Sequence, residues 1–129
     1  MSKSSIAIRR TVKGAVPAIS FEKIARSILG ANYELSLVLC GDTLARRMNR
    51  TYRKKEYAPN VLSFPYSPRE GEIFLNIRKA EREARAMGTS PRKRATLLFV
   101  HGCFHLKGLK HGERMEAAER RVLKRFELL

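Results

Sequence analysis

Three histidines lie close together near the C-terminus, and they are the only histidines in the chain. They occupy the first, fifth and last positions of the string HGCFHLKGLKH, as His101, His105 and His111. Side chains four residues apart on a helix point to the same face, so His101 and His105 can bind one ion together. Gly108 allows the chain to leave the helix and to bring His111 over that face as a third ligand.

Three imidazole nitrogens with one open position are typical of a catalytic zinc ion, whereas a structural zinc usually takes four ligands rich in cysteine. Cys103 projects from nearly the opposite side of the helix, and we expect it to be a small core residue. The sequence therefore predicts one catalytic divalent ion per chain, with zinc as the first candidate and no small-molecule cofactor.

The spacing HxxxHxxGxxH also occurs in zinc proteases, in which a glutamate after the first histidine is the general base. Here that position is Gly102, which has no side chain that can accept a proton. Peptide hydrolysis by that mechanism is therefore disfavoured.

The chain is strongly basic, because 27 Lys and Arg stand against 12 Asp and Glu and give a formal charge of +15. Such a charge attracts polyanions, and nucleic acid fits best, although charge does not separate RNA from DNA. A basic surface without a specific ligand is the alternative. One segment is expected to hold backbone phosphates without reading sequence, through Arg46, Arg47, Arg50, Lys54 and Lys55.

The elements that must position these groups alternate along the chain, which predicts a single α+β domain over residues 1–129 with a small mixed sheet. Strands are expected at 5–9, 33–40, 61–64 and 73–77, the last two as an antiparallel pair. Helices are expected at 21–29, 42–52, 78–87, 91–107 and 113–126. Ser20 and Asp42 are the expected N-caps of the first two helices.

The helix over 91–107 carries the first two histidines and is apolar on much of its surface, so we expect it in the core. Ser90 is its expected N-cap, Pro91 its first residue and Gly108 its end. The metal site would thus lie on a central helix and on the loop after it.

Two cysteines, Cys40 and Cys103, are too few for a disulfide framework, and the start MSKSSIAIRR lacks the apolar core of a secretory signal. Apolar runs such as Leu97 to Val100 are far shorter than the roughly 20 residues that cross a bilayer. We therefore expect a cytoplasmic protein that does not span a membrane.

The histidine string resembles the signature HGxLHLxGYDH of the YbeY family, metal-dependent endoribonucleases involved in ribosomal RNA maturation. Other stretches resemble this family in the same order, over roughly residues 33 to the C-terminus. They are Met48 to Arg53, Val61 to Pro65, Gly71 to Ile73, Met115 and Glu119.

The resemblance implies an α+β fold with His101, His105 and His111 on zinc and with Arg53 near the metal. A guanidinium there can bind a phosphodiester through two hydrogen bonds and stabilise the charge that builds during cleavage. We therefore expect Arg53 and His101 to be catalytic. Without the resemblance, Arg53 would be one more solvated charge of its basic segment. Ser63 and Asn49 also match the family pattern, and we expect each to be structural or to support the residues of the site rather than to be catalytic.

The resemblance further implies a zinc-dependent endoribonuclease that prefers single strands and acts on ribosomal RNA precursors and ribosomal particles. Its expected roles are maturation of the 3′ end of the small-subunit RNA and ribosome quality control. Lys110 and Leu109 replace the family's aspartate and tyrosine, and Pro59 and Asn60 replace its Thr-Asp pair. These departures keep open a non-catalytic RNA-binding assembly factor with a structural metal. The sequence leaves the oligomeric state open.

Overall fold

A single four-stranded sheet with five helices forms the protein, as seen in a computed structural model that describes residues 5–109 and 112–126. The sheet order is β1-β2-β4-β3. The expected α+β fold with a small mixed sheet is therefore confirmed. In chain order the elements are β1 (Ser5–Arg10), α1 (Phe21–Leu29), β2 (Glu34–Cys40), α2 (Asp42–Arg53), β3 (Val61–Ser67), β4 (Glu70–Asn76), α3 (Ile77–Met87), α4 (Pro91–Leu106) and α5 (Glu113–Arg125).

Strands β1, β2 and β4 are parallel, and β3 runs antiparallel to β4 at the edge of the sheet. The antiparallel pair was expected, but both of its strands extend further toward their turn than the sequence predicted. An edge strand tolerates proline, and the pairing shifts register between Pro65 and Ser67. Ile77, expected to end a strand, instead begins α3.

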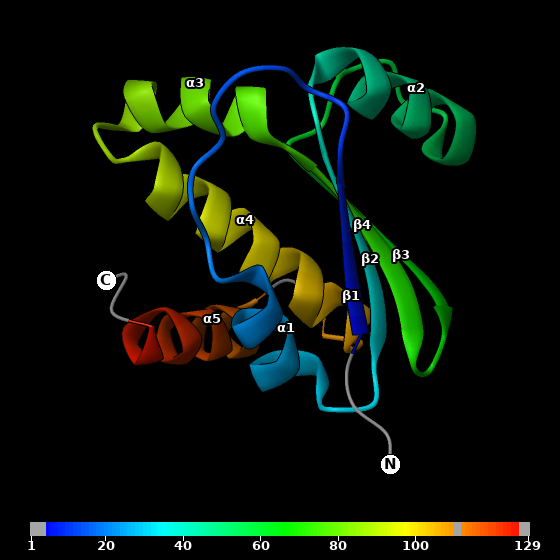
Figure 1. Ribbon diagram of the computed structural model, residues 1–129, viewed down its shortest axis with the longest axis vertical. Coiled ribbons are helices and arrows are strands. Elements are labelled where there is room, and N and C mark those ends of the chain that lie inside the picture. Colours follow the sequence, from blue (N-terminus) through cyan, green and yellow to red (C-terminus); the bar gives the residue numbers. More distant parts are fainter. Residues whose placement is uncertain (1–4, 110–111, 127–129) are drawn as a thin grey trace.

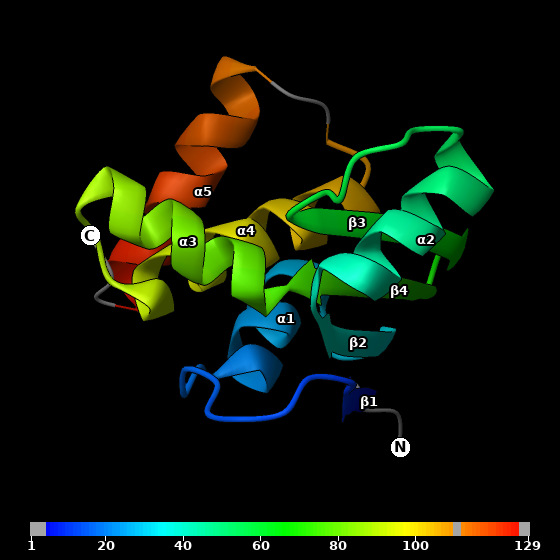
Figure 2. The same ribbon diagram turned by 90° about the horizontal axis from the view of Figure 1, so that it is seen from above.

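The helices cover the two faces of the sheet unequally (Figures 1 and 2). Helices α1, α3, α4 and α5 lie on one face, and α2 lies on the other. Leu37, Ile73 and Leu75 point into the larger core, where they pack with α1, α4 and α5. Val38 and Phe74, one residue out of phase with these, belong to the smaller core under α2.

Helix α4 is the central helix, as expected, because it packs against α1, α3, α5 and the sheet, and in Figure 1 it runs diagonally toward the lower end of the strands. The Ser90 hydroxyl accepts a hydrogen bond from the Lys93 backbone N–H (3.1 Å), which confirms the N-cap. Two glycines allow helix and sheet to approach closely. A Cβ on Gly102 would lie 2.9 Å from Ser63 Oγ, and one on Gly71 would lie 2.9 Å from Leu106.

Two expected N-caps are wrong. Ser20 makes no side-chain cap hydrogen bond, and Asp42 is the first residue of α2, after Gly41. The Asp42 carboxylate instead accepts hydrogen bonds from Arg82 (2.8 and 2.9 Å) and from Asn76 Nδ2 (2.9 Å). The carboxylate thus binds a guanidinium and an amide from distant parts of the chain, and hydrogen bonds to a guanidinium carry both charge and a fixed geometry. These contacts also lower the pKa of Asp42, with the Arg82 bonds as the largest cause.

Candidate active site

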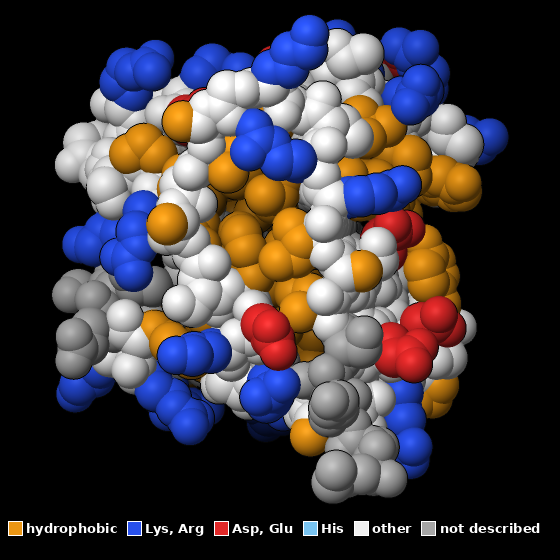
Figure 3. All heavy atoms as spheres, viewed as in Figure 1, with side chains coloured by type: hydrophobic (Ala, Val, Ile, Leu, Met, Phe, Trp, Pro, Cys, Tyr) orange, Lys and Arg blue, Asp and Glu red, His pale blue; other side chains and the backbone are white. Residues whose placement is uncertain are grey.

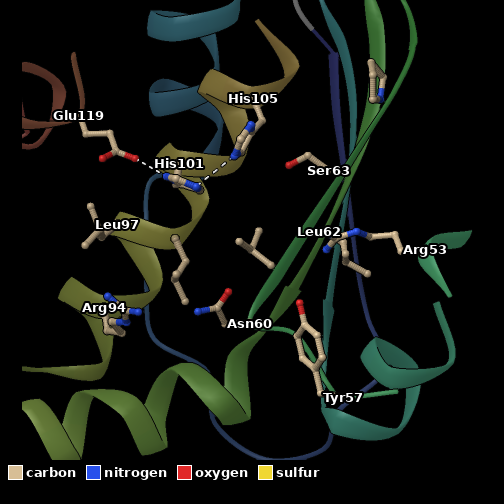
Figure 4. Close-up of a pocket in the computed structure, with 13 residues that line it drawn as sticks. Arg53, Tyr57, Asn60, Leu62, Ser63, Arg94, Leu97, His101, His105 and Glu119 are labelled. Atoms are coloured by element: carbon tan, nitrogen blue, oxygen red, sulfur yellow. Dashed lines mark hydrogen bonds and ion pairs between the residues drawn. The ribbon is translucent and has the colours of Figure 1, made fainter. Parts of the chain in front are cut away.

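His101 and His105 face the same side of α4, one turn apart, as their spacing predicted (Figure 4). Their Nε2 atoms lie 3.1 Å apart, and the two rings meet edge to face at 83°. Two ligand nitrogens at about 2.0–2.1 Å from a tetrahedral zinc are roughly 3.3 Å apart. The pair therefore fits two positions of such a site.

The third expected ligand, His111, lies outside the described residues, as does Lys110. Within 5–109 and 112–126, no group of three His, Cys, Asp or Glu side chains is arranged to hold a metal ion. The three-histidine site thus stays a prediction, of which the structure describes two members.

Glu119, on α5, fixes the orientation of the His101 ring. Its Oε2 lies 2.6 Å from His101 Nδ1, and both side chains are largely buried. A carboxylate only accepts hydrogen bonds, so Nδ1 of His101 is the donor to Glu119, and Nε2 is the nitrogen that faces His105. A carboxylate that binds the outer nitrogen of a ligating histidine is a frequent support of metal sites, because it raises the basicity of the ligand.

Gly102 has a packing role in the wall that carries the histidines. Its missing side chain leaves room for Ser63, Ile73 and Val61, whose nearest atoms would lie 2.9–3.3 Å from a Cβ. Ser63 Oγ donates a hydrogen bond to the Gly102 carbonyl (3.1 Å), which links α4 to β3. A glutamate at this position would not fit, and the contact is consistent with the structural role expected of Ser63.

The histidines open into a cleft of about 780 Å³ between α4 and the β3 side of the sheet. Arg53, at the end of α2, lines the opposite side, and Figure 4 shows its guanidinium pointing into the cleft. Its side chain is exposed, and no acidic group among residues 5–109 and 112–126 forms an ion pair with it. The structure thus brings Arg53 and the histidine pair to one cleft.

Buried Asn49 holds the chain that follows Arg53. Its side-chain Nδ2 donates to the Tyr57 backbone carbonyl (2.9 Å), and its backbone carbonyl accepts from the Lys55 N–H (3.3 Å). The helix ends just before Lys54, whose backbone is left-handed (φ 59°). These contacts turn the chain at the end of α2 so that both Arg53 and Tyr57 line the cleft.

The remaining basic residues of this segment lie on the exposed surface and do not line the cleft. Arg50 pairs with Glu56 at 3.2 Å. Figure 3 shows Lys and Arg spread around the rim of one face of the molecule, with few acidic side chains between them. The charge therefore acts as a general attraction for a polyanion, and Arg53 is the member of its segment positioned at the site.

The two cysteines, Cys40 and Cys103, are buried and fill space in the core. Cys103 is in the core, as expected, and burial raises the pKa of its thiol. Burial also raises the pKa of Cys40 to about 12. Both thiols are therefore protonated near neutral pH, and neither is a reactive group.

Sequence reasoning missed two polar arrangements. The sequence resemblance includes Glu119 but gives it no role, because no local spacing rule joins residues on α5 to His101. A second arrangement at the end of the cleft links Asn60, Glu83 and Arg94 through hydrogen bonds of 2.9–3.3 Å. These three residues come from three separate parts of the chain, so their contact has no signal in the local pattern.

Fold and site together define a small basic α+β protein with a paired-histidine cleft. No helix in the described part of the chain combines the length and apolar character needed to cross a membrane. The solution structure of TM1509 from Thermotoga maritima has a similar fold, with a TM-score of 0.66 at 19% identity, over 95% of this chain and 91% of that one.

The sequence profile of the family described as "Endoribonuclease YbeY" matches residues 2–127, and the chain belongs to that family. A relative named Endoribonuclease YbeY from Pseudomonas entomophila is 39% identical over 106 residues, which are 72% of this chain and 68% of that protein. One of the same name from Stutzerimonas stutzeri is 35% identical over 124 residues, which are 87% and 78% of the two chains. The chain thus spans about two thirds or more of these relatives.

Proposed function

We propose that this protein is a zinc-dependent endoribonuclease that cleaves single-stranded RNA. The observation that carries the proposal is the His101 and His105 pair, held by Glu119 and facing Arg53 across one cleft. The family and the relatives named endoribonuclease support the reaction class. Zinc, with one ion per chain, follows from the nitrogen donors and from the expected third ligand, His111.

Arg53 binds the phosphodiester in this proposal. Its planar guanidinium donates two parallel hydrogen bonds to phosphate oxygens and stabilises the negative charge that builds on them during cleavage. His101 and His105 would hold the metal in a fixed place, because Glu119 and the packing of α4 restrict their rings. A zinc ion held there would act as a Lewis acid beside the phosphate.

Single strands suit the groups around the cleft. Tyr57 lines the cleft and is 53% exposed, so a base can stack on its ring. The exposed basic residues of α2 and the following turn attract the backbone without reading sequence. We further propose that the protein acts in the cytoplasm in ribosomal RNA maturation, at the 3′ end of the small-subunit RNA, and in ribosome quality control.

The first experiment measures the zinc content of the purified protein and its cleavage of a single-stranded ribosomal RNA fragment. The wild type is compared with His105→Ala and with Lys107→Ala, an exposed residue just after α4. We expect about one zinc per chain and cleavage in the wild type and the control, and loss of both in His105→Ala. The melting temperature of each variant separates loss of the site from loss of the fold.

Two results would contradict the proposal. Cleavage that survives His105→Ala would remove the histidine site from the reaction. Zinc without cleavage would favour the alternative, a non-catalytic RNA-binding assembly factor. In that case a chelator should lower the melting temperature while RNA still binds and stays intact.

A further inference from the structure

One end of the cleft holds a polar arrangement that the proposed cleavage does not use. Asn60 lies just before β3, Glu83 is on α3, and Arg94 is on α4. Asn60 Nδ2 donates to both carboxylate oxygens of Glu83, each at 3.3 Å. Arg94 Nε donates to the same carboxylate at 2.9 Å, and the side chains of Arg94 and Glu83 are only 17% and 24% exposed.

This arrangement fixes which end of the Asn60 amide faces the cleft. A carboxylate has only acceptors, so the Asn60 amide nitrogen must face Glu83 and the amide oxygen must face away. In Figure 4 the oxygen points into the cleft, toward the side where the histidines lie. Among the residues that the structure describes, none donates a hydrogen bond to this oxygen. The cleft therefore contains a fixed acceptor with no partner from the described chain.

The acceptor limits the group that can bind there to a hydrogen-bond donor. A strand whose phosphate is held by Arg53 carries its riboses directly attached to the phosphates, within the same cleft. The ribose 2′-hydroxyl is the donor that RNA has and DNA lacks. Every base also has a hydrogen-bond donor on its edge, so an acceptor that bound only bases would not distinguish one base from another.

We propose that the Asn60 amide oxygen accepts a hydrogen bond from a ribose 2′-hydroxyl. This bond would make Asn60 a determinant of the selectivity for RNA over DNA. Glu83 is then a positioning residue, because it orients the amide without touching the strand. The inference rests on the proposed function, since it places the substrate of that activity in the same cleft.

The test uses single-stranded RNA in which one nucleotide at a time is replaced by its 2′-deoxy form. The base at that position is either uracil or adenine, so that the effect of the sugar is separated from the effect of the base. The holoprotein is compared with Asn60→Leu, Glu83→Gln and Asn32→Leu, a matched change at an exposed asparagine outside the cleft. Dissociation constants are measured on ice by fluorescence anisotropy, and kcat/KM is measured on the same strands. Binding tests the inference and cleavage tests the proposed function, so the two can fail separately.

We expect the wild type and Asn32→Leu to bind about 3- to 10-fold more weakly when one particular nucleotide is 2′-deoxy, which is the effect of one hydrogen bond. In Asn60→Leu that difference should vanish. In Glu83→Gln the difference in binding between the ribose and 2′-deoxy strands should shrink. A glutamine amide has both a donor and an acceptor, so it can pair with either the oxygen or the nitrogen of the Asn60 amide and no longer fixes its orientation.

Three results would overturn the inference. They are a wild type with no position sensitive to 2′-deoxy substitution, an Asn60→Leu variant that keeps the full difference, and a difference that follows the base rather than the sugar. A purely structural Asn60 would give the second result, since its loss would weaken binding of ribose and deoxyribose strands equally.

Discussion

The two walls of the cleft are built differently. On the α4 wall, His101 is held by Glu119 at 2.6 Å, and Gly102 allows the helix to pack against the sheet. On the opposite wall, Arg53 ends its helix as an exposed side chain that no acidic group of the described residues pairs with. One wall is fixed by buried contacts, and the other presents its cation to solvent.

This difference matches two different tasks. Metal ligands must be preorganised, because a small displacement of a nitrogen changes its fit to the ion. An arginine that binds phosphate stays charged whether it is exposed or buried, and its long side chain can adapt to the position of the strand. We therefore expect changes on the α4 wall to affect metal binding and stability, and changes on the α2 wall to affect the reaction with RNA.

Arg53→Ala should have the largest effect on the reaction while the metal stays bound. We expect kcat/KM for RNA cleavage to fall by about 10²–10³-fold, as when one charge-stabilising donor is removed. Arg53→Lys should recover only part of this loss, because an ammonium lacks the planar pair of donors. Zinc content should be unchanged. Arg85→Ala, an exposed arginine outside the cleft, is the control, and an equal loss in that variant would contradict a specific role of Arg53.

Glu119→Gln should weaken the metal site and leave phosphate binding intact. We expect zinc affinity to fall by about 10–100-fold, because the amide holds His101 less firmly and no longer raises its basicity. Competition with a chelator measures this affinity. Glu116→Gln, an exposed change one turn earlier on α5, should bind zinc as the wild type does. An unchanged zinc affinity in Glu119→Gln would remove Glu119 from the metal site.

Gly102→Ala should destabilise the fold of the α4 wall. The added methyl would meet Ser63 Oγ at 2.9 Å, and overpacking of this kind costs about 1–3 kcal/mol, offset by roughly 1 kcal/mol of helix propensity. Urea unfolding measures the free energy of unfolding. The double variant Gly102→Ala, Ser63→Ala should lose less stability than the sum of the two single changes, since the closest clash is gone. Simple additivity would mean that Ser63 is not the obstacle.

Asp42→Asn should have the smallest effect and should depend on pH. The folded protein lowers the pKa of Asp42, so its stabilisation is present above about pH 4, the ordinary pKa of aspartate, and is lost as the pH falls through the lowered pKa. The carboxylate is 38% exposed, so we expect less than about 1 kcal/mol. The free energy of unfolding of the variant should therefore approach that of the wild type in acid. A constant difference across pH would contradict this, and Glu56→Gln in the exposed pair with Arg50 is the control.

Local sequence patterns predicted most of the elements. Helical spacing placed His101 and His105 on one face, and Ser90 marked the start of α4 correctly. The errors occurred where distant partners compete with local ones. Asp42 has the residue type of an N-cap, but Arg82 and Asn76 bind its carboxylate instead.

The sequence by itself determined the histidine pair, the basic charge and the alternation of strands and helices, because these depend on residue type and on spacing within one element. Only the tertiary structure decided that Glu119 holds His101, that Arg53 faces them, and that Glu83 turns the amide of Asn60 into the cleft. These contacts join segments far apart in the chain. Periodicity carries no information about such contacts, since they depend on how the helices pack on the sheet.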